Sequence, residues 1–166
     1  MRAGVALGSN LGDRLGQLQS AREKILHLSA ATPPFVFSAL YETEPVGCEA
    51  TAGKFLNAAL ELGFEDEPER LSRELRTIEI SLGRKPDHER NLSRTIDLDL
   101  LYFGDTVIDR PELQLPHPRM HLRRFVLAPL ADIRPDLILP RQTEPVHVLL
   151  ARLVDKSAVV RVADEW

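Results

Sequence analysis

Two acidic residues stand two positions apart in the segment Arg94-Thr-Ile-Asp-Leu-Asp-Leu-Leu101. The apolar residues around them predict a β-strand over residues 95–103. Because residues two apart in a strand point to the same face, roughly 6.5 Å from each other, Asp97 and Asp99 share a face. The residues between and beside them point to the opposite face, into a core: Ile96, Leu98 and Leu100.

The face that carries the two acids changes character along the strand. Leu101 and Phe103 follow on it, so it turns from acidic to apolar, and we expect the acids to lie where the sheet opens to a cleft. Two carboxylates this close repel each other and lose hydration when partly covered. Magnesium removes that penalty, because it binds one or two carboxylates together with phosphate oxygens and water. The alternative is a pair of solvated acids that guards an edge strand against aggregation.

Cationic residues flank the acidic strand on both sides in the sequence. The preceding segment, expected to be an exposed loop, and the following segment carry them: Arg84, Lys85, Arg90 and Arg94, then His117, Arg119, His121, Arg123 and Arg124. Guanidinium forks bind phosphate oxygens while a metal ion bridges phosphates from another side. For any one of these arginines taken singly, a surface salt bridge is the default interpretation. Two clusters around one acid pair favour a metal–triphosphate ligand.

Other polar residues stand out by their position in the expected elements. Glu79 falls on the last turn of a helix, where the helix dipole disfavours a carboxylate, so it is either a solvated surface residue or is held by another group. Asn57 shares a strand face with Phe55 amid apolar residues, and a buried amide needs partners. It either serves a strand end or binds a flat nitrogen heterocycle. Phe55 and Phe125 are also compatible with an ordinary core, and Asn10 with a helix cap that does or does not line a site.

The elements that would position these residues follow from hydrophobic periodicity. Strands are expected at residues 4–7, 35–41, 55–62, 95–103 and 158–162, and helices at 11–28, 68–82, 125–133 and 146–153. Pro33-Pro34 should end the first helix, while Pro68 and Gly83 fit the first turn and the end of the second. The order β-α-β-β-α-β with additions indicates an α+β sandwich, in which helices pack on a mostly antiparallel sheet.

Composition narrows the class of protein. A chain of 166 residues with 43% hydrophobic and 28% charged residues suits one globular domain spanning 1–166. The net charge of −4 argues against a dedicated binder of duplex nucleic acid. Cys48 is the only cysteine, which excludes an internal disulfide and favours a reducing cytoplasm. The first residues do not resemble a secretory signal, and no apolar run approaches the roughly 20 residues that span a bilayer.

Five sequence blocks together resemble the 6-hydroxymethyl-7,8-dihydropterin pyrophosphokinases of folate biosynthesis. They lie in the family's order across nearly the whole chain: residues 6–12, 41–47, 55–59, 94–101 and 116–125. The Arg-x-x-Asp-x-Asp block is the most specific. The resemblance implies a ferredoxin-like α+β fold and transfer of diphosphate from ATP to the pterin hydroxymethyl group, with release of AMP. It also implies small-molecule partners alone, without nucleic acid or membrane, and we expect a monomer.

The resemblance assigns roles to individual residues. Asp97 and Asp99 would bind two magnesium ions that bridge the triphosphate of the co-substrate ATP. Arg84 and Arg94, in a mobile loop and at its end, would contact phosphates during catalysis. The remaining residues of the ATP site would be Glu79, His117 and Arg123. The pterin site would comprise Thr43, Glu44 and Val46, largely through backbone groups, with Asn57 as a hydrogen-bonding partner and Phe55 and Phe125 against the ring. Asp97, a metal ligand, would also belong to the pterin site.

The chain departs from the family pattern at three positions. Pro86 replaces a second arginine, Asn91 a frequent tryptophan, and Pro118 a tyrosine found in some members, so the loop could be stiffer and Lys85 or Arg90 could share the phosphate contact. These departures leave open a catalytically impaired pterin- or nucleotide-binding relative. A further alternative is a nucleic-acid module that stacks bases on the aromatic residues Phe35, Phe37 and Tyr41. Against it, the chain is acidic, and Phe35 and Phe37 share a face that would more simply face a core.

Overall fold

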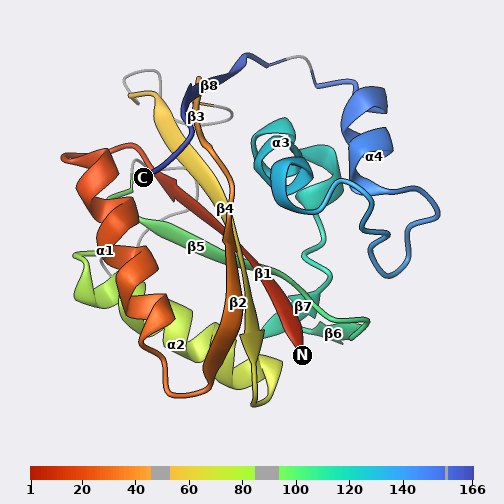
Figure 1. Ribbon diagram of the computed structural model, residues 1–166, viewed down its shortest axis with the longest axis horizontal. Coiled ribbons are helices and arrows are strands. Elements are labelled where there is room, and N and C mark those ends of the chain that lie inside the picture. Colours follow the sequence, from red (N-terminus) through yellow and green to blue (C-terminus); the bar gives the residue numbers. More distant parts are fainter. Residues whose placement is uncertain (46–52, 85–93, 156) are drawn as a thin grey trace.

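The structure is a computed structural model that describes residues 1–45, 53–84, 94–155 and 157–166. Its centre is an antiparallel sheet in the order β5-β1-β4-β3-β8, with β2 also paired to β4 (Figure 1). These strands are β1 (Arg2–Ser9), β2 (Ala31–Phe37), β3 (Leu40–Thr43), β4 (Phe55–Phe64), β5 (Asp97–Phe103) and β8 (Val159–Ala163). The expected α+β architecture with an antiparallel sheet is confirmed.

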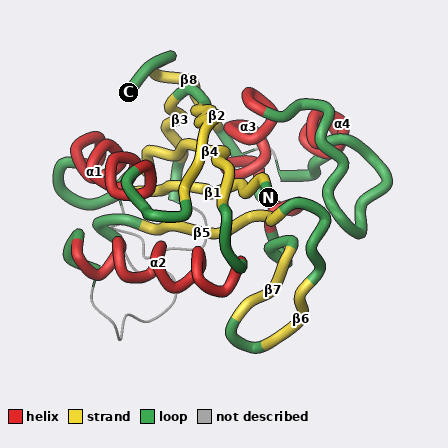
Figure 2. Tube along the Cα trace, turned by 60° about the horizontal axis from the view of Figure 1, so that its bottom comes forward, coloured by secondary structure: helices red, strands yellow, loops and turns green. Residues whose placement is uncertain are grey.

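Helices cover both faces of the sheet. Helices α1 (Arg14–Leu26) and α2 (Pro68–Ser81) pack on one face, and α3 (Arg124–Ile133) and α4 (Val146–Arg152) lie on the other side (Figures 1 and 2). A small hairpin, β6 (Ile108–Arg110) and β7 (Leu113–Leu115), and a 3-10 turn (Met120–Leu122) connect β5 to α3. The sequence pattern did not predict this hairpin or the turn. No helix in the described ranges has both the length and the apolar character needed to cross a bilayer.

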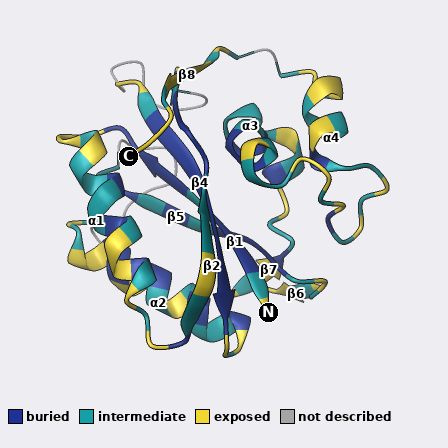
Figure 3. Ribbon diagram, in the orientation of Figure 1, coloured by how far each residue is buried: buried dark blue, intermediate teal, exposed yellow. Residues whose placement is uncertain are grey.

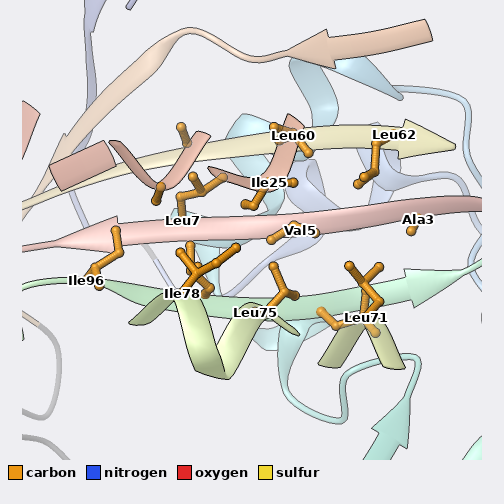
Figure 4. Packing of buried hydrophobic residues seen from close by; sticks show 14 of the residues in the cluster. Ala3, Val5, Leu7, Ile25, Leu60, Leu62, Leu71, Leu75, Ile78 and Ile96 are labelled. Carbon is orange, nitrogen blue, oxygen red and sulfur yellow. The ribbon is translucent and has the colours of Figure 1, made fainter. Parts of the chain in front are cut away.

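The larger core lies between the sheet and the first two helices. Alternate residues of β1 point into it, where they meet apolar residues of β4, α1 and α2 (Figure 4): Ala3, Val5, Leu7, Leu60, Leu62, Ile25, Leu71, Leu75 and Ile78. Strand β4 is buried along almost its whole length (Figure 3). This packing makes the middle strands a firm floor for anything built on the opposite face.

The two adjacent prolines have a different role from the one predicted. Helix α1 ends at Leu26, and Pro33 and Pro34 lie inside β2. The ladder between β2 and β4 is interrupted between Thr32 and Val36, so the missing proline N–H groups leave no sheet hydrogen bond unmade. The strand expected at residues 35–41 is correspondingly divided into β2 and β3.

A bulge in β5 changes which of the two cores the side chains of that strand enter. Val5 of β1 lies opposite Leu100, but the next residue, Gly4, lies opposite Tyr102, so Leu101 is the additional residue. Leu101 and Tyr102 both belong to the second core, beneath α3 and α4. Phe103 returns to the first core, and the prediction that it shares a face with the two acids is wrong.

The second face of the sheet contains a buried carboxylate with four charge-assisted contacts. Glu61 of β4 is 1% exposed and accepts from Arg2 Nε at 2.9 Å and Nη2 at 2.6 Å, and from Arg134 Nη1 at 3.1 Å. The Tyr102 hydroxyl also donates to it across β1. Gly4 makes that crossing possible, because a Cβ there would lie 2.1 Å from the Tyr102 ring.

Aromatic residues at the other end of the sheet are packed rather than free. Trp166 Nε1 donates to the Ser38 carbonyl at 2.9 Å, and its ring meets Phe37 edge-on at 6.2 Å between centroids. The Arg22 guanidinium lies 4.9 Å from the Trp166 ring. Phe35 and Phe37 pack against the first core and Tyr41 is 8% exposed, so the base-stacking platform is not formed.

Candidate active site

The acid pair stands above small residues of the central strand. Asp97 lies opposite Gly8 of β1, and Asp99 lies opposite Ala6. On the other side of β1, Gly8 is paired with Asn57 of β4. Asp97, Gly8 and Asn57 therefore form a row across three strands, and two strand spacings separate the acid from the amide by roughly 10 Å along the sheet.

Two arginines hold both oxygens of Asp97. Arg84, just beyond α2, places Nη1 2.8 Å from Asp97 Oδ1, and Arg94 Nη1 lies 2.6 Å from Oδ2. Arg94 is itself fixed at its backbone, because its N–H donates to Asn10 Oδ1 at 2.6 Å and its carbonyl accepts from the Asn10 N–H at 3.1 Å. Asn10 was expected as a helix cap, but Asp13 caps α1 by accepting from the Gly16 N–H. Asn10 instead positions an arginine of the site.

Glu79 lies behind Arg84 and is not a solvated surface residue. It is 5% exposed, accepts from the Leu98 N–H at 2.7 Å and bonds the Arg84 guanidinium. Burial raises the pKa of Glu79 to about 7, against the opposing effects of the Leu98 N–H and Arg84. Glu79 thus ties the end of α2 to the backbone between the two aspartates, and it reaches the site through Arg84 rather than by lining it.

Asp99 is a half-buried carboxylate facing cations. Within the described residues no hydrogen bond or ion pair reaches it, and burial, followed by the charge of Asp97, raises its pKa. His117, Arg123 and Arg94 act in the opposite direction. His117 is positioned by its N–H, which donates to the Leu101 carbonyl at 2.8 Å, and burial lowers the pKa of its imidazole. A cation bound beside Asp99 would stabilise its negative charge, which burial and the neighbouring Asp97 disfavour.

At the other end of the row, Asn57 and two nearby phenylalanines could bind a flat polar ring. Asn57 is 6% exposed, and its Nδ2 donates to Thr43 Oγ1 at 2.8 Å, which leaves the amide oxygen without a bond to a described residue. Gly8 gives this amide room, since a Cβ there would lie 3.1 Å from Asn57 Oδ1. Phe55 and Phe125 stand on the same cavity.

One cleft of about 690 Å³ collects these groups on the α3 face of the sheet. Eleven of the residues predicted for the site line it: Thr43, Glu44, Phe55, Asn57, Arg84, Arg94, Asp97, Asp99, His117, Arg123 and Phe125. Glu79 stands behind this lining, and Val46 lies outside the described residues. Segments far apart in the sequence therefore converge as the flanking charges suggested.

A sequence model described as 7,8-dihydro-6-hydroxymethylpterin-pyrophosphokinase (HPPK) matches residues 4–135. The chain belongs to the HPPK family. A Bacillus subtilis protein named 2-amino-4-hydroxy-6-hydroxymethyldihydropteridine pyrophosphokinase is 46% identical over 129 residues, covering 78% of this chain and 75% of the relative. A Pseudomonas aeruginosa protein of the same name is 41% identical over 139 residues, 84% of each chain.

Solved structures agree on the fold. The wild-type Plasmodium falciparum HPPK-DHPS chain with SDX-DHP matches with a TM-score of 0.70 at 14% identity over 91% of this chain. The same chain crystallised with pterin and p-hydroxybenzoate gives a TM-score of 0.69 at 15% identity. The present chain spans 44% and 42% of those two chains, less than half of their length.

Some residues that line the HPPK cleft were not among the predicted site residues. They are Ala6, Leu7, Gly8, Gln114, Pro118, Arg119 and Val126. A glycine inside a strand signals close approach of another group, so Gly8 was detectable. Arg119 belongs to the basic segment after the acidic strand, and the sequence does not distinguish it from its neighbours there. Gln114 gave no signal, because the hairpin that presents it was not predicted. Of the departures from the family pattern, Pro118 lines the cleft, whereas Pro86 and Asn91 lie outside the described residues.

Proposed function

We propose that this chain transfers diphosphate from ATP to the hydroxymethyl group of 6-hydroxymethyl-7,8-dihydropterin, as a magnesium-dependent HPPK of folate biosynthesis. Family membership names the reaction class, and the observation that carries the proposal is the single cleft. Its acid pair and arginines suit a metal–triphosphate. The Asn57 amide, with Phe55 and Phe125, suits a pterin, and it lies roughly 10 Å from Asp97 along the sheet. We also propose that the chain acts as a monomer.

The reaction requires alignment more than covalent chemistry by the protein. The pterin hydroxyl oxygen forms a bond to the β-phosphorus of ATP, the bond from that phosphorus to the α,β-bridging oxygen breaks, and AMP leaves with the bridging oxygen. The hydroxyl proton passes to solvent. Arg84, Arg94, Arg123 and His117 would hold phosphate oxygens and balance their charge, since guanidinium groups bind phosphates in forked pairs.

Asp97 and Asp99 would hold the magnesium, which we propose as two ions by analogy with the family. The donor set fits, because two carboxylates share one face and Asp99 lacks a hydrogen-bond donor in the described part of the chain. In the described ranges no group of three or more acidic, histidine or cysteine side chains could hold a metal, so phosphate oxygens and water would complete the coordination. Bound there, magnesium would draw charge from the phosphates undergoing transfer.

Product identity tests the proposed reaction. The chain is incubated with ATP, magnesium and the reduced hydroxymethylpterin, and nucleotides are separated by chromatography. We expect AMP and pterin diphosphate in equal amounts. ADP in place of AMP would contradict the diphosphate transfer. Binding of ATP without turnover would instead indicate the impaired relative.

Asn57→Ala tests the pterin end of the cleft. The variant removes the amide that faces the cavity and also leaves Thr43 Oγ1 without its donor. We expect the KM for the pterin to rise about 10- to 100-fold, because the loss of one buried hydrogen-bond partner of a ligand weakens its binding by about that factor. Steady-state kinetics at saturating ATP measures it.

The KM for ATP in the same Asn57→Ala variant provides the internal control and should change by less than about twofold. Equal increases in both KM values would place Asn57 outside the pterin site.

A further inference from the structure

The carboxylate expected to bind metal is already neutralised in this structure. Arg84 Nη1 contacts one oxygen of Asp97 at 2.8 Å, and Arg94 Nη1 contacts the other at 2.6 Å. The three side chains are 20–26% exposed, so these ion pairs are partly withdrawn from water. Partly buried pairs are screened less by water and salt than exposed ones, so they compete with a cation that approaches Asp97.

Both arginines are held in place by other parts of the chain. Glu79, buried at the end of α2, accepts from the same Arg84 nitrogen that contacts Asp97. The backbone of Arg94 is bonded at both its N–H and its carbonyl to Asn10. Their position beside Asp97 is therefore built into the fold by α2 and the end of β1.

Other cations of the cleft are arranged differently. Arg119 and Arg123 line the same cavity, and in the described part of the chain neither guanidinium has an ion-pair partner. The described cleft thus contains two sets of arginines: Arg119 and Arg123, without an ion-pair partner among the described residues, and Arg84 and Arg94, which are paired with Asp97.

We infer that Arg84 and Arg94 make this site selective for the metal–nucleotide complex over the free divalent cation, by an exchange of ion pairs at Asp97. Phosphate oxygens take the two guanidinium groups, and the carboxylate they release becomes a ligand for the cation that the phosphates carry. Without phosphates the arginines keep Asp97 closed to metal. The inference rests on the proposed function, whose acid pair and triphosphate it uses. Linkage makes the effect reciprocal, so nucleotide and metal each raise the affinity for the other.

Manganese binding without catalysis tests this exchange. Free Mn²⁺ is measured by electron paramagnetic resonance during titration of the whole chain, with and without α,β-methylene-ATP, which cannot be cleaved between its α- and β-phosphates; the Mn²⁺ that the analogue binds without protein is subtracted. Wild type should bind Mn²⁺ weakly alone and at least about tenfold more tightly with the analogue. Arg94→Gln should bind Mn²⁺ alone at least about tenfold more tightly than wild type, and the analogue about tenfold more weakly, since one ion pair is lost in each state.

Two matched variants separate the exchange from simple loss of positive charge. Arg119→Gln removes a cation from the same cleft that does not contact Asp97, and Arg152→Gln removes one from an ion pair with Glu144 on α4. Both should change the affinity for Mn²⁺ alone by less than about threefold. Arg84→Gln repeats the main test if Arg94→Gln does not fold, as judged by circular dichroism.

Several results would contradict the exchange of ion pairs at Asp97. An unchanged or weakened affinity of Arg94→Gln for Mn²⁺ alone, or an equal gain in Arg119→Gln, would overturn the exchange while AMP formation by wild type still upheld the proposed reaction. Tight binding of Mn²⁺ by wild type without nucleotide would overturn it as well. Failure of wild type to bind Mn²⁺ even with the analogue would overturn both the exchange and the metal role of the acid pair.

Discussion

Asp97→Asn is expected to lower kcat for AMP formation by at least about a thousandfold, because the neutral amide neither holds a divalent cation as a carboxylate does nor balances the arginines around it. Asp97 contacts Arg84 and Arg94 and stands at one end of the row that leads across Gly8 to Asn57. Steady-state assays of AMP release measure the loss. The nucleotide-dependent binding of Mn²⁺ should weaken in parallel.

The matched control for this variant is Asp105→Asn. Asp105 lies in the exposed turn just beyond β5, so the same chemical change there should leave kcat within about twofold of wild type. Near-normal turnover by a folded Asp97→Asn protein would rule out Asp97 as the metal ligand of the reaction.

Glu61→Ala is expected to reduce the free energy of unfolding by about 3 kcal/mol, because removal of one member of a buried ion network leaves the others unpaired. The Tyr102 hydroxyl and the guanidinium groups of Arg2 and Arg134 would each lose their bond to the Glu61 carboxylate. The side chains of these arginines remain 30% and 40% exposed, and water offsets part of their loss. Urea unfolding at constant pH gives the value from the midpoint and slope.

Glu61→Gln is the matched variant for the network. It keeps the volume and one acceptor oxygen, so we expect about half of the loss seen with alanine. Equal stabilities of wild type and Glu61→Ala would mean that the network contributes nothing net. The cleft lies elsewhere on the sheet, so kcat measured well below the unfolding transition should stay within about threefold of wild type in both variants.

The sequence was sufficient where local pattern decides structure. Period-two alternation placed Asp97 and Asp99 on one face without knowledge of any partner strand, and the helix from Pro68 to Gly83 was marked at both ends by residues with special backbone properties. The position of Phe103 was not accessible in this way. It depends on the bulge opposite Gly4 and Val5, which arises from pairing with a strand about a hundred residues earlier.

The sequence predicts which charged residues gather at the site better than it predicts which of them contact one another. The basic segments and the acid pair pointed to triphosphate, but the sequence could not reveal that Arg84 and Arg94 bind Asp97 itself. That contact depends on how α2 ends beside β5 and on the hold of Asn10 on Arg94. The surface interpretation of Glu79 failed for the same reason, because its burial is set by packing against a strand that follows it in the chain.

The packing of Trp166 determines what an optical experiment on this chain can detect. The chain has one tryptophan, and its indole is fixed between Arg22, Phe37 and the Ser38 carbonyl, away from the residues that line the cleft. Its emission therefore monitors whether α1 and the edge of the sheet are assembled, which suits the urea titrations. Arg22, Phe37 and Ser38 do not line the cleft, so we expect these described contacts of the indole to stay in place when the cleft is occupied. Ligand titrations are therefore better followed by a signal carried by the ligand, such as the fluorescence of the pterin.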